Sequence, residues 1–154
     1  MSLGKIGDIL QAQGKLEEAK AAFEKSQSIH QTLTDKYPSY PRFQGDIASS
    51  LESIGDILQA QGKLEEAKSV FEKSLTIRQT LADNDPSNAG WQTDVVFSHQ
   101  KLMAISLEKG DKKEARKHVK AALAILEPLE KAGLLNASQQ GWPGYMKEKL
   151  NELE

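Results

Sequence analysis

Two identical stretches of fifteen residues decide the fold of this chain. IGDILQAQGKLEEAK occupies residues 6–20 and occurs again, unchanged, at residues 54–68, which is a shift of 48 positions (54 − 6 = 48). A catalytic motif is rarely duplicated within so short a chain, whereas a structural module often is. Self-similarity at a fixed period of about 20–50 residues is typical of stacked repeat architectures.

The similarity extends beyond the repeated phrase. At the same shift, Phe23 matches Phe71 and Pro38 matches Pro86. A third, more degenerate copy begins a further 48 residues along the chain. At four positions this third copy has the same amino acid as the second copy, namely at Gly110, Ala115, Leu123 and Ile125.

Within one copy the apolar residues have helical spacing. Steps of 4, 3 and 4 residues place side chains on one face of a helix, and these steps separate Ile47, Leu51, Ile54 and Leu58. Gly62 then interrupts the pattern and suits the left-handed backbone that ends many helices. The periodicity resumes after Gly62 and stops again at NDPSN, residues 84–88, where Asp, Asn and Pro favour a turn.

We therefore predict an all-α fold of about three helical hairpins over a single domain, residues 1–154. The repeats are expected at 1–40, 41–88 and 89–135, with a final capping helix at 138–153. Pro128 should kink the sixth helix or fray its end. Each hairpin has an apolar stripe too wide to cover alone, so neighbouring hairpins must stack. The predicted helices are 2–13, 15–36, 41–61, 63–84, 89–109, 111–132 and 138–153.

The joint pattern resembles the tetratricopeptide repeat over about residues 3–132. The family has small residues where its two helices approach and at the turn between them, and an aromatic residue in the second helix. The resemblance implies a right-handed α-α superhelix. The matching positions are Gly7 and Gly55, Gly14, Gly62 and Gly110, Ala19, Ala67 and Ala115, Phe23 and Phe71, and Ser26, Ser74 and Ala122.

The sequence also departs from this family. The usual period is about 34 residues, so a period of 48 places the chain with the longer variants, in which both helices are extended. In the third copy Met103 replaces Gly55 and Val119 replaces Phe71, which leaves close packing there an open question. A HEAT-like array has a nearer period but does not explain the paired Gly and Ala positions.

Composition excludes several classes of protein. The chain has 20 basic and 22 acidic residues, and this balance gives no electrostatic reason to expect nucleic acid as a partner. It has no cysteine and no apolar run that approaches a membrane span, and its first residues lead us to expect no signal peptide. We therefore expect a cytoplasmic protein that does not enter a membrane.

No constellation of residues indicates catalysis. The three histidines are His30, His99 and His118, and only His118 has a possible metal ligand one helical turn away, Glu114. We interpret all three as exposed polar residues on helices. No nucleotide-binding or nucleophile motif is present. We expect no catalytic residue, no metal and no cofactor; a deep pocket with two converging ionisable groups would favour an enzyme instead.

The resemblance implies that a protein or peptide partner binds along the first helix of each repeat. The family's groove positions fall on residues spaced 3, 4 and 3 apart, which share a helical face and avoid the apolar stripe. The predicted groove residues are Asp8 and Gln11, then Ser49, Glu52, Asp56 and Gln59, and finally Phe97, Gln100, Ala104 and Leu107.

This surface would be polar and acidic at one end and more apolar at the other, which favours a basic or amphipathic peptide. Members of the family that bind acidic chaperone tails have asparagines where this chain has Asp8 and Asp56, so no acidic tail should bind. The alternative function is self-association. The first helical pair is incomplete, and a homodimer could cover its apolar residues Ile6, Ile9 and Leu10.

Overall fold

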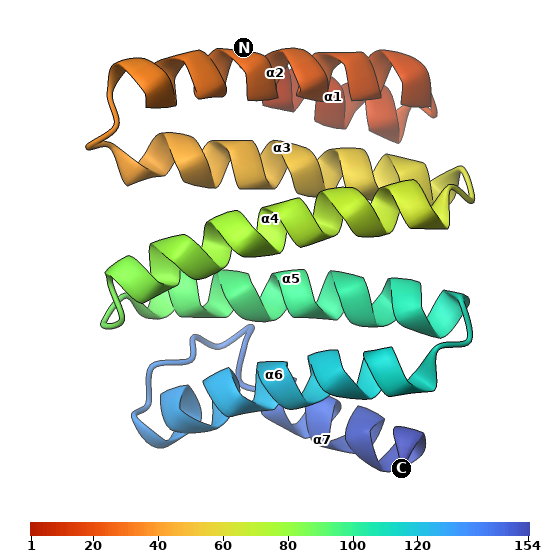
Figure 1. Ribbon diagram of the computed structural model, residues 1–154, viewed down its shortest axis with the longest axis vertical. Helices are drawn as coiled ribbons and strands as arrows, with labels where there is room; N and C mark the ends of the chain where they lie inside the picture. The colour runs from red at the N-terminus through yellow and green to blue at the C-terminus, as the bar shows by residue number, and fades with distance from the viewer. The chain divides into compact units, whose positions relative to one another are not determined.

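The computed structural model describes all 154 residues and contains seven α-helices and no strand (Figure 1). The predicted all-α fold is confirmed, and the first six helices begin and end within one residue of their predicted bounds. The helices are α1 (Leu3–Ala12), α2 (Leu16–Lys36), α3 (Pro41–Ala60), α4 (Leu64–Asn84), α5 (Ala89–Glu108), α6 (Lys112–Lys131) and α7 (Trp142–Leu153).

The chain forms two compact units, Met1–Ile77 and Arg78–Glu154, with the boundary inside α4. Consecutive helices pack against each other within each unit. In the first unit α2 contacts both α1 and α3, and in the second unit α6 contacts both α5 and α7. The organisation of residues 1–154 as a single domain stays a prediction.

Glycine ends the first helix of every hairpin. Gly14, Gly62 and Gly110 all have φ of +74°, in the left-handed region. At Gly62 the glycine N–H donates to the carbonyl of Gln59, and the next N–H, of Lys63, donates to the carbonyl of Leu58, each at 2.9 Å. This backbone costs an L-residue about 1–2 kcal/mol, which explains why glycine recurs here and confirms the predicted turns.

The two helices of a hairpin touch where a glycine faces a phenylalanine. A Cβ atom built on Gly55 would lie 2.5 Å from Cε1 of Phe71, and one on Gly7 would lie 2.6 Å from Cζ of Phe23. Both rings are buried. Because no side chain fits between the helix and the ring, the predicted close approach of the two helices is confirmed for these two hairpins.

The third hairpin packs closely without this glycine. Met103 on α5 and Val119 on α6 are both buried and belong to the hydrophobic core of the second unit, together with Leu126 and Met146. A larger side chain on the first helix therefore accompanies a smaller one on the second. Core packing tolerates such exchanges when the total volume is kept.

One prediction near the C-terminus is wrong, and so is one of the two alternatives given for Pro128, whose kink stays a prediction. The last helix begins at Trp142 rather than 138, because Asn136 closes a turn in which its Oδ1 accepts a hydrogen bond from the N–H of Gln139 at 3.1 Å. Pro128 does not fray α6, which continues to Lys131. Proline removes only the N–H that would bond the carbonyl of Ala124, and Ala124 is exposed, so water can take that place.

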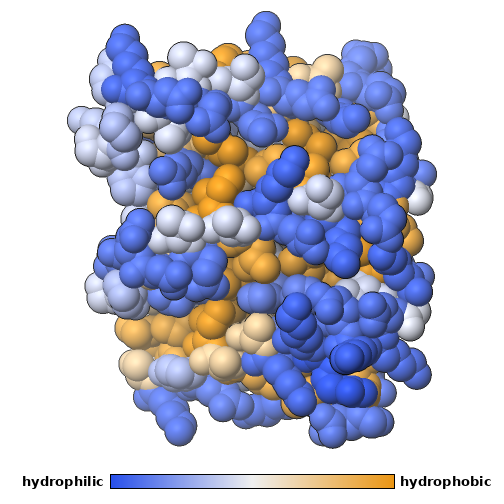
Figure 2. All heavy atoms as spheres, viewed as in Figure 1, coloured by the Kyte–Doolittle hydropathy of each residue, from blue (hydrophilic) through white to orange (hydrophobic).

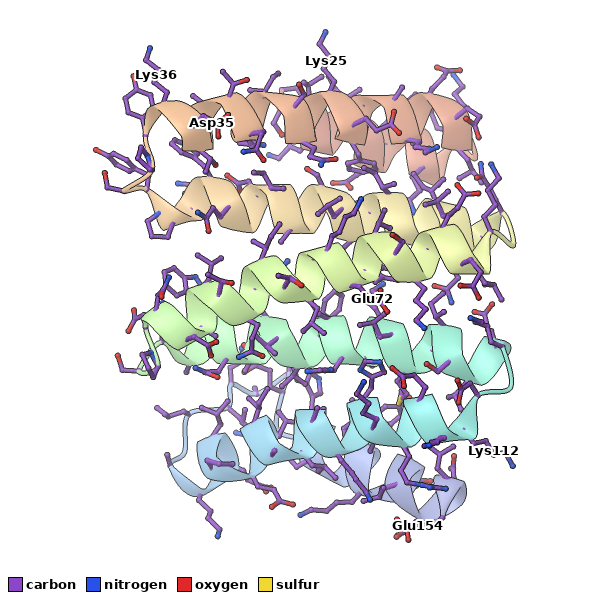
Figure 3. All side chains as sticks on the ribbon, viewed as in Figure 1. Lys25, Asp35, Lys36, Glu72, Lys112 and Glu154 are labelled. Atoms are coloured by element: carbon purple, nitrogen blue, oxygen red, sulfur yellow. The ribbon has the colours of Figure 1, made fainter.

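Apart from Glu52 and Arg78, which are buried, the helices keep their charged side chains at least partly exposed. Lys25, Lys36 and Lys112 project away from the ribbon in Figure 3. On the face drawn in Figure 2, polar side chains cover most of the surface and apolar atoms are visible in strips between them. None of the seven helices combines the length and the apolar character that crossing a lipid bilayer requires.

Candidate protein-binding surface

The first unit holds the acidic part of the predicted surface, on α1 and α3. Asp8 and Ser49 are exposed, whereas Gln11, Asp56 and Gln59 are half-buried. These residues alternate with a buried apolar stripe on α3, which packs into the unit. The stripe consists of Ile47, Leu51, Ile54 and Leu58, each no more than 5% exposed.

Glu52 differs from the other predicted residues of α3 because it is only 6% exposed. Its Oε1 lies 3.0 Å from Oγ of Ser74, and the same hydroxyl lies 3.2 Å from the carbonyl oxygen of Ala48. The single hydroxyl proton can be donated to either oxygen. Glu52 thus ties the two helices of the second hairpin together and offers little surface to a partner.

The second unit holds the more apolar part, on α5. Phe97 and Leu107 are both 38% exposed, and Gln100 and Ala104 are half-buried. The ammonium group of Lys101 lies 5.1 Å from the centre of the Phe97 ring, within the range of a cation–π contact. This part of α5 therefore presents apolar side chains with a cation beside one of them.

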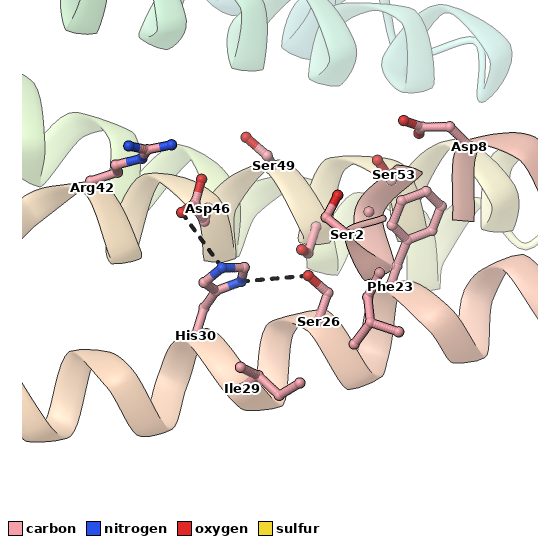
Figure 4. Close-up of a pocket in the computed structure, with 13 residues that line it drawn as sticks. Ser2, Asp8, Phe23, Ser26, Ile29, His30, Arg42, Asp46, Ser49 and Ser53 are labelled. Carbon is pink, nitrogen blue, oxygen red and sulfur yellow. Dashed lines mark hydrogen bonds and ion pairs between the residues drawn. The ribbon is translucent and has the colours of Figure 1, made fainter. Parts of the chain in front are cut away.

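A cleft of about 580 Å³ opens in the first unit between α1, α2 and α3 (Figure 4). It is lined by Asp8 and Ser49 from the predicted surface and by Ser26 and His30 from α2. The His30 ring contacts a residue of its own helix and a residue of α3. Nδ1 lies 3.4 Å from Oγ of Ser26, and Nε2 lies 3.6 Å from Oδ2 of Asp46 on α3.

The sequence contains a signal for this contact that the first-helix pattern did not include. His30 and Asp46 are 16 residues apart (46 − 30 = 16), and one repeat later Arg78 and Asp94 have the same spacing (94 − 78 = 16). The guanidinium of Arg78 lies 3.0 Å from the carboxylate of Asp94. In both copies, a basic residue on the second helix of one repeat thus faces an aspartate on the first helix of the following repeat.

Comparison with known families agrees with this geometry. Family models for the tetratricopeptide repeat match residues 2–31 and residues 47–87, and each match contains one copy of the repeated phrase. The chain is a tetratricopeptide repeat protein. Repeats of this family generally mediate protein–protein interaction. A comparison with curated proteins gave no match.

In this tetratricopeptide repeat protein the one close pair of histidines joins α5 to α6. Nδ1 of His99 lies 3.0 Å from Nδ1 of His118, and Nε2 of His118 lies 3.3 Å from a carboxylate oxygen of Glu114. His118 is only 6% exposed and His30 and His99 are half-buried, so the interpretation of the three histidines as exposed residues is wrong. In the pair, Nδ1 of each ring is thus occupied by the other ring, and Nε2 of His118 by Glu114.

Burial above all lowers the pKa of His99 from its ordinary value of 6.5 to about 4, with smaller contributions from the charges of His118 and Lys117. His99 is therefore neutral near pH 7. The structure contains no group of three or more His, Asp or Glu side chains arranged to hold a metal ion. The histidine pair joins two helices of the repeat.

Proposed function

We propose that this tetratricopeptide repeat protein is an interaction module that binds a basic or amphipathic protein segment along its first helices. The proposal rests on one observation above all. Asp8 stands exposed on α1 without an ion-pair partner, and Asp56 occupies the corresponding position on α3. An exposed carboxylate without a counter-charge, such as that of Asp8, attracts a partner of the opposite sign and orients it.

The apolar side chains of α5 support an amphipathic partner. Phe97 and Leu107 occupy the predicted positions of the third first helix and keep more than a third of their surface exposed. Aromatic and aliphatic side chains of this kind serve as anchors for one face of a bound peptide helix. Apolar residues of a partner segment would contact Phe97 and Leu107 on this surface of the second unit.

Selection of peptides from a random library against the full chain tests this function. Peptides rich in Lys and Arg should be enriched, and their affinity should fall at least tenfold when Asp8→Arg reverses the charge on α1. Asp35→Arg is the matched control, since Asp35 is an exposed aspartate on the second helix α2. Equal losses in the two variants, or enrichment of acidic peptides with submicromolar affinity, would contradict the proposal.

Self-association is the second candidate, favoured by the exposure of apolar residues on α1. Ile6 is 36% and Ile9 is 45% exposed, although both are large aliphatic side chains. A second copy of the chain that covers them would form a dimer. Light scattering at increasing concentration should then show a dimer that Ile9→Asp converts to a monomer, whereas a monomer at all concentrations excludes this function.

A further inference from the structure

The third repeat differs from the second at three positions near the contact between α5 and α6. At the shift of 48 residues, the second copy has only apolar or small residues there. The pairs are His99 and Leu51, Met103 and Gly55, and His118 and Val70. Two imidazoles and a thioether thus stand where the repeat otherwise has hydrocarbon or no side chain. Burying a polar ring costs free energy unless the ring gains a partner, so this exchange requires a physical reason.

The three side chains lie at one level of the third hairpin. Met103 follows His99 by four residues, so the two share a face of α5. Met103 is buried in the hydrophobic core of the second unit. Ala115 and Ala122, one turn before and one turn after His118 on α6, belong to the same core. The flexible thioether of Met103 therefore packs at the level where the two rings meet.

The rings of His99 and His118 point their Nδ1 atoms straight at each other. These atoms are 3.0 Å apart and the ring centres are 5.3 Å apart, a difference of 2.3 Å (5.3 − 3.0 = 2.3). That difference is about twice the distance from the centre of a five-membered ring to one of its atoms, so both nitrogens lie on the line that joins the centres. The two lone-pair directions therefore nearly coincide. Such a pair shares a proton or, with the rings further apart, holds a cation between them.

Glu114 determines which nitrogen of His118 carries the hydrogen. Its carboxylate lies 3.3 Å from Nε2 of His118 and accepts only, so Nε2 donates and Nδ1 presents its lone pair to His99. A carboxylate on the outer nitrogen is the arrangement that orients metal-binding imidazoles and strengthens them as ligands. Since His99 is half-buried, water can move its hydrogen from Nδ1 to Nε2. Both Nδ1 atoms then serve as ligands, and no proton is released.

We propose that His99, His118 and Met103 form a binding site for a soft monovalent cation, Cu⁺. Imidazole suits copper, and thioethers select its monovalent form. Cu⁺ accepts two ligands in line or three in a plane, whereas Zn²⁺ takes about four in a tetrahedron. With metal–nitrogen bonds of about 2 Å and angles near 120°, the Nδ1 atoms would lie about 3.5 Å apart, so the rings part by only about 0.5 Å. The sequence predicts no metal because these ligands stand on two helices, which only the fold brings together.

Titration of the full chain with Ag⁺ tests this site, because Ag⁺ has the charge and the ligand preferences of Cu⁺ and is stable in air. The chain has no cysteine that would compete for the ion. Calorimetry should show binding that Cu⁺, kept reduced by ascorbate under nitrogen, displaces. Nitrogen NMR should show shifts at Nδ1 of His99 and His118, and Zn²⁺ should bind at least tenfold more weakly. Absence of Ag⁺ binding, or tighter binding of Zn²⁺ than of Ag⁺, would overturn the proposal.

The second copy supplies variants that remove the imidazoles. His99→Leu and His118→Val introduce the residues that the second copy has at these positions, so the hairpin should still fold, as circular dichroism checks. Each variant should weaken Ag⁺ binding at least tenfold. His30→Gln is the matched control, since His30 lies in the first unit, and it should leave the affinity unchanged. Unchanged affinity in the folded His99→Leu and His118→Val variants, or an equal loss in His30→Gln, would overturn the proposal.

Two buried methionines provide a matched pair for the third ligand. Met103 and Met146 both belong to the core of the second unit, and leucine conserves the volume of either. Met103→Leu should weaken Ag⁺ binding about tenfold, whereas Met146→Leu should leave it unchanged. The methyl carbon of Met103, and not that of Met146, should shift in carbon NMR when Ag⁺ is added. Equal effects of the two substitutions would contradict the proposed set of ligands.

Discussion

Substituting Gly55 by alanine probes the contact that holds a hairpin together. The new Cβ would lie 2.5 Å from Cε1, 2.7 Å from Cζ and 2.9 Å from Cδ1 of Phe71, whose ring is fully buried. Carbon atoms normally approach to about 3.5–4.0 Å. The ring or the helix must therefore move by about 1 Å in an interior that is already close-packed.

The net effect follows from two opposing terms. Overpacking a core typically costs about 1–3 kcal/mol. The higher helix propensity of alanine relative to glycine offsets up to about 1 kcal/mol of that cost. We expect Gly55→Ala to reduce the free energy of unfolding by about 1–2 kcal/mol, which lowers Tm by roughly 2–8 °C in a chain of this length.

The same helix supplies the control. A Cβ on Gly45 would meet no atom within 4 Å, so Gly45→Ala should raise the free energy of unfolding by up to about 1 kcal/mol. Urea unfolding followed by far-ultraviolet circular dichroism measures both variants. If Gly55→Ala stabilises the chain as Gly45→Ala does, the close approach of α3 to α4 is refuted.

The third hairpin suggests how to rescue the substitution. Because Met103 and Val119 stand where the second hairpin has Gly55 and Phe71, the double variant Gly55→Met, Phe71→Val should recover part of the stability lost in the two single variants. We expect a favourable coupling of about 1–2 kcal/mol in the double-mutant cycle. Additive losses would show that the two positions do not share one volume.

Three further predictions follow from single contacts. Gly62→Ala should reduce the free energy of unfolding by about 1–2 kcal/mol, measured by urea unfolding, because its φ is +74°. Ser74→Ala should cost about 1–3 kcal/mol in the same assay, since it removes a buried donor to Glu52. Since the pKa of His99 is lowered to about 4, its contribution to stability is complete above pH 6.5 and is lost as the pH falls toward 4. The variant His99→Gln should therefore lose about 1 kcal/mol less free energy of unfolding between pH 7 and pH 5 than the original chain; this figure allows for the partial exposure of His99. An unchanged dependence of stability on pH would contradict the assigned pKa.

Much of the fold could be predicted because the same pattern of glycine and apolar residues recurs along the chain. Gly14, Gly62 and Gly110 mark the turns at one period, and the apolar stripe of α3 has unambiguous helical spacing. Periodicity of this kind reports local backbone conformation, which neighbouring residues in the sequence determine. Where the period breaks, beyond residue 132, the prediction of α7 was early by four residues (142 − 138 = 4).

The candidate surface could be predicted less well, because burial depends on contacts that are distant in the sequence. Glu52 belongs to the predicted face by helical spacing, yet Ser74, 22 residues away, draws it into the hairpin. That the larger Met103 is accompanied by the smaller Val119 could also be recognised only once α5 and α6 were placed against each other. His30 could have been found, since its spacing from Asp46 recurs in the next copy.

Proton NMR tests the central claim most directly, namely that the first two repeats are helical hairpins whose two helices meet at a glycine and a phenylalanine. The α-protons of Gly55 and Gly7 should show nuclear Overhauser effects to the rings of Phe71 and Phe23, respectively, and upfield shifts from those rings. The account predicts both effects in both hairpins. Glycine α-protons at ordinary shifts, without contacts to the rings, would contradict it.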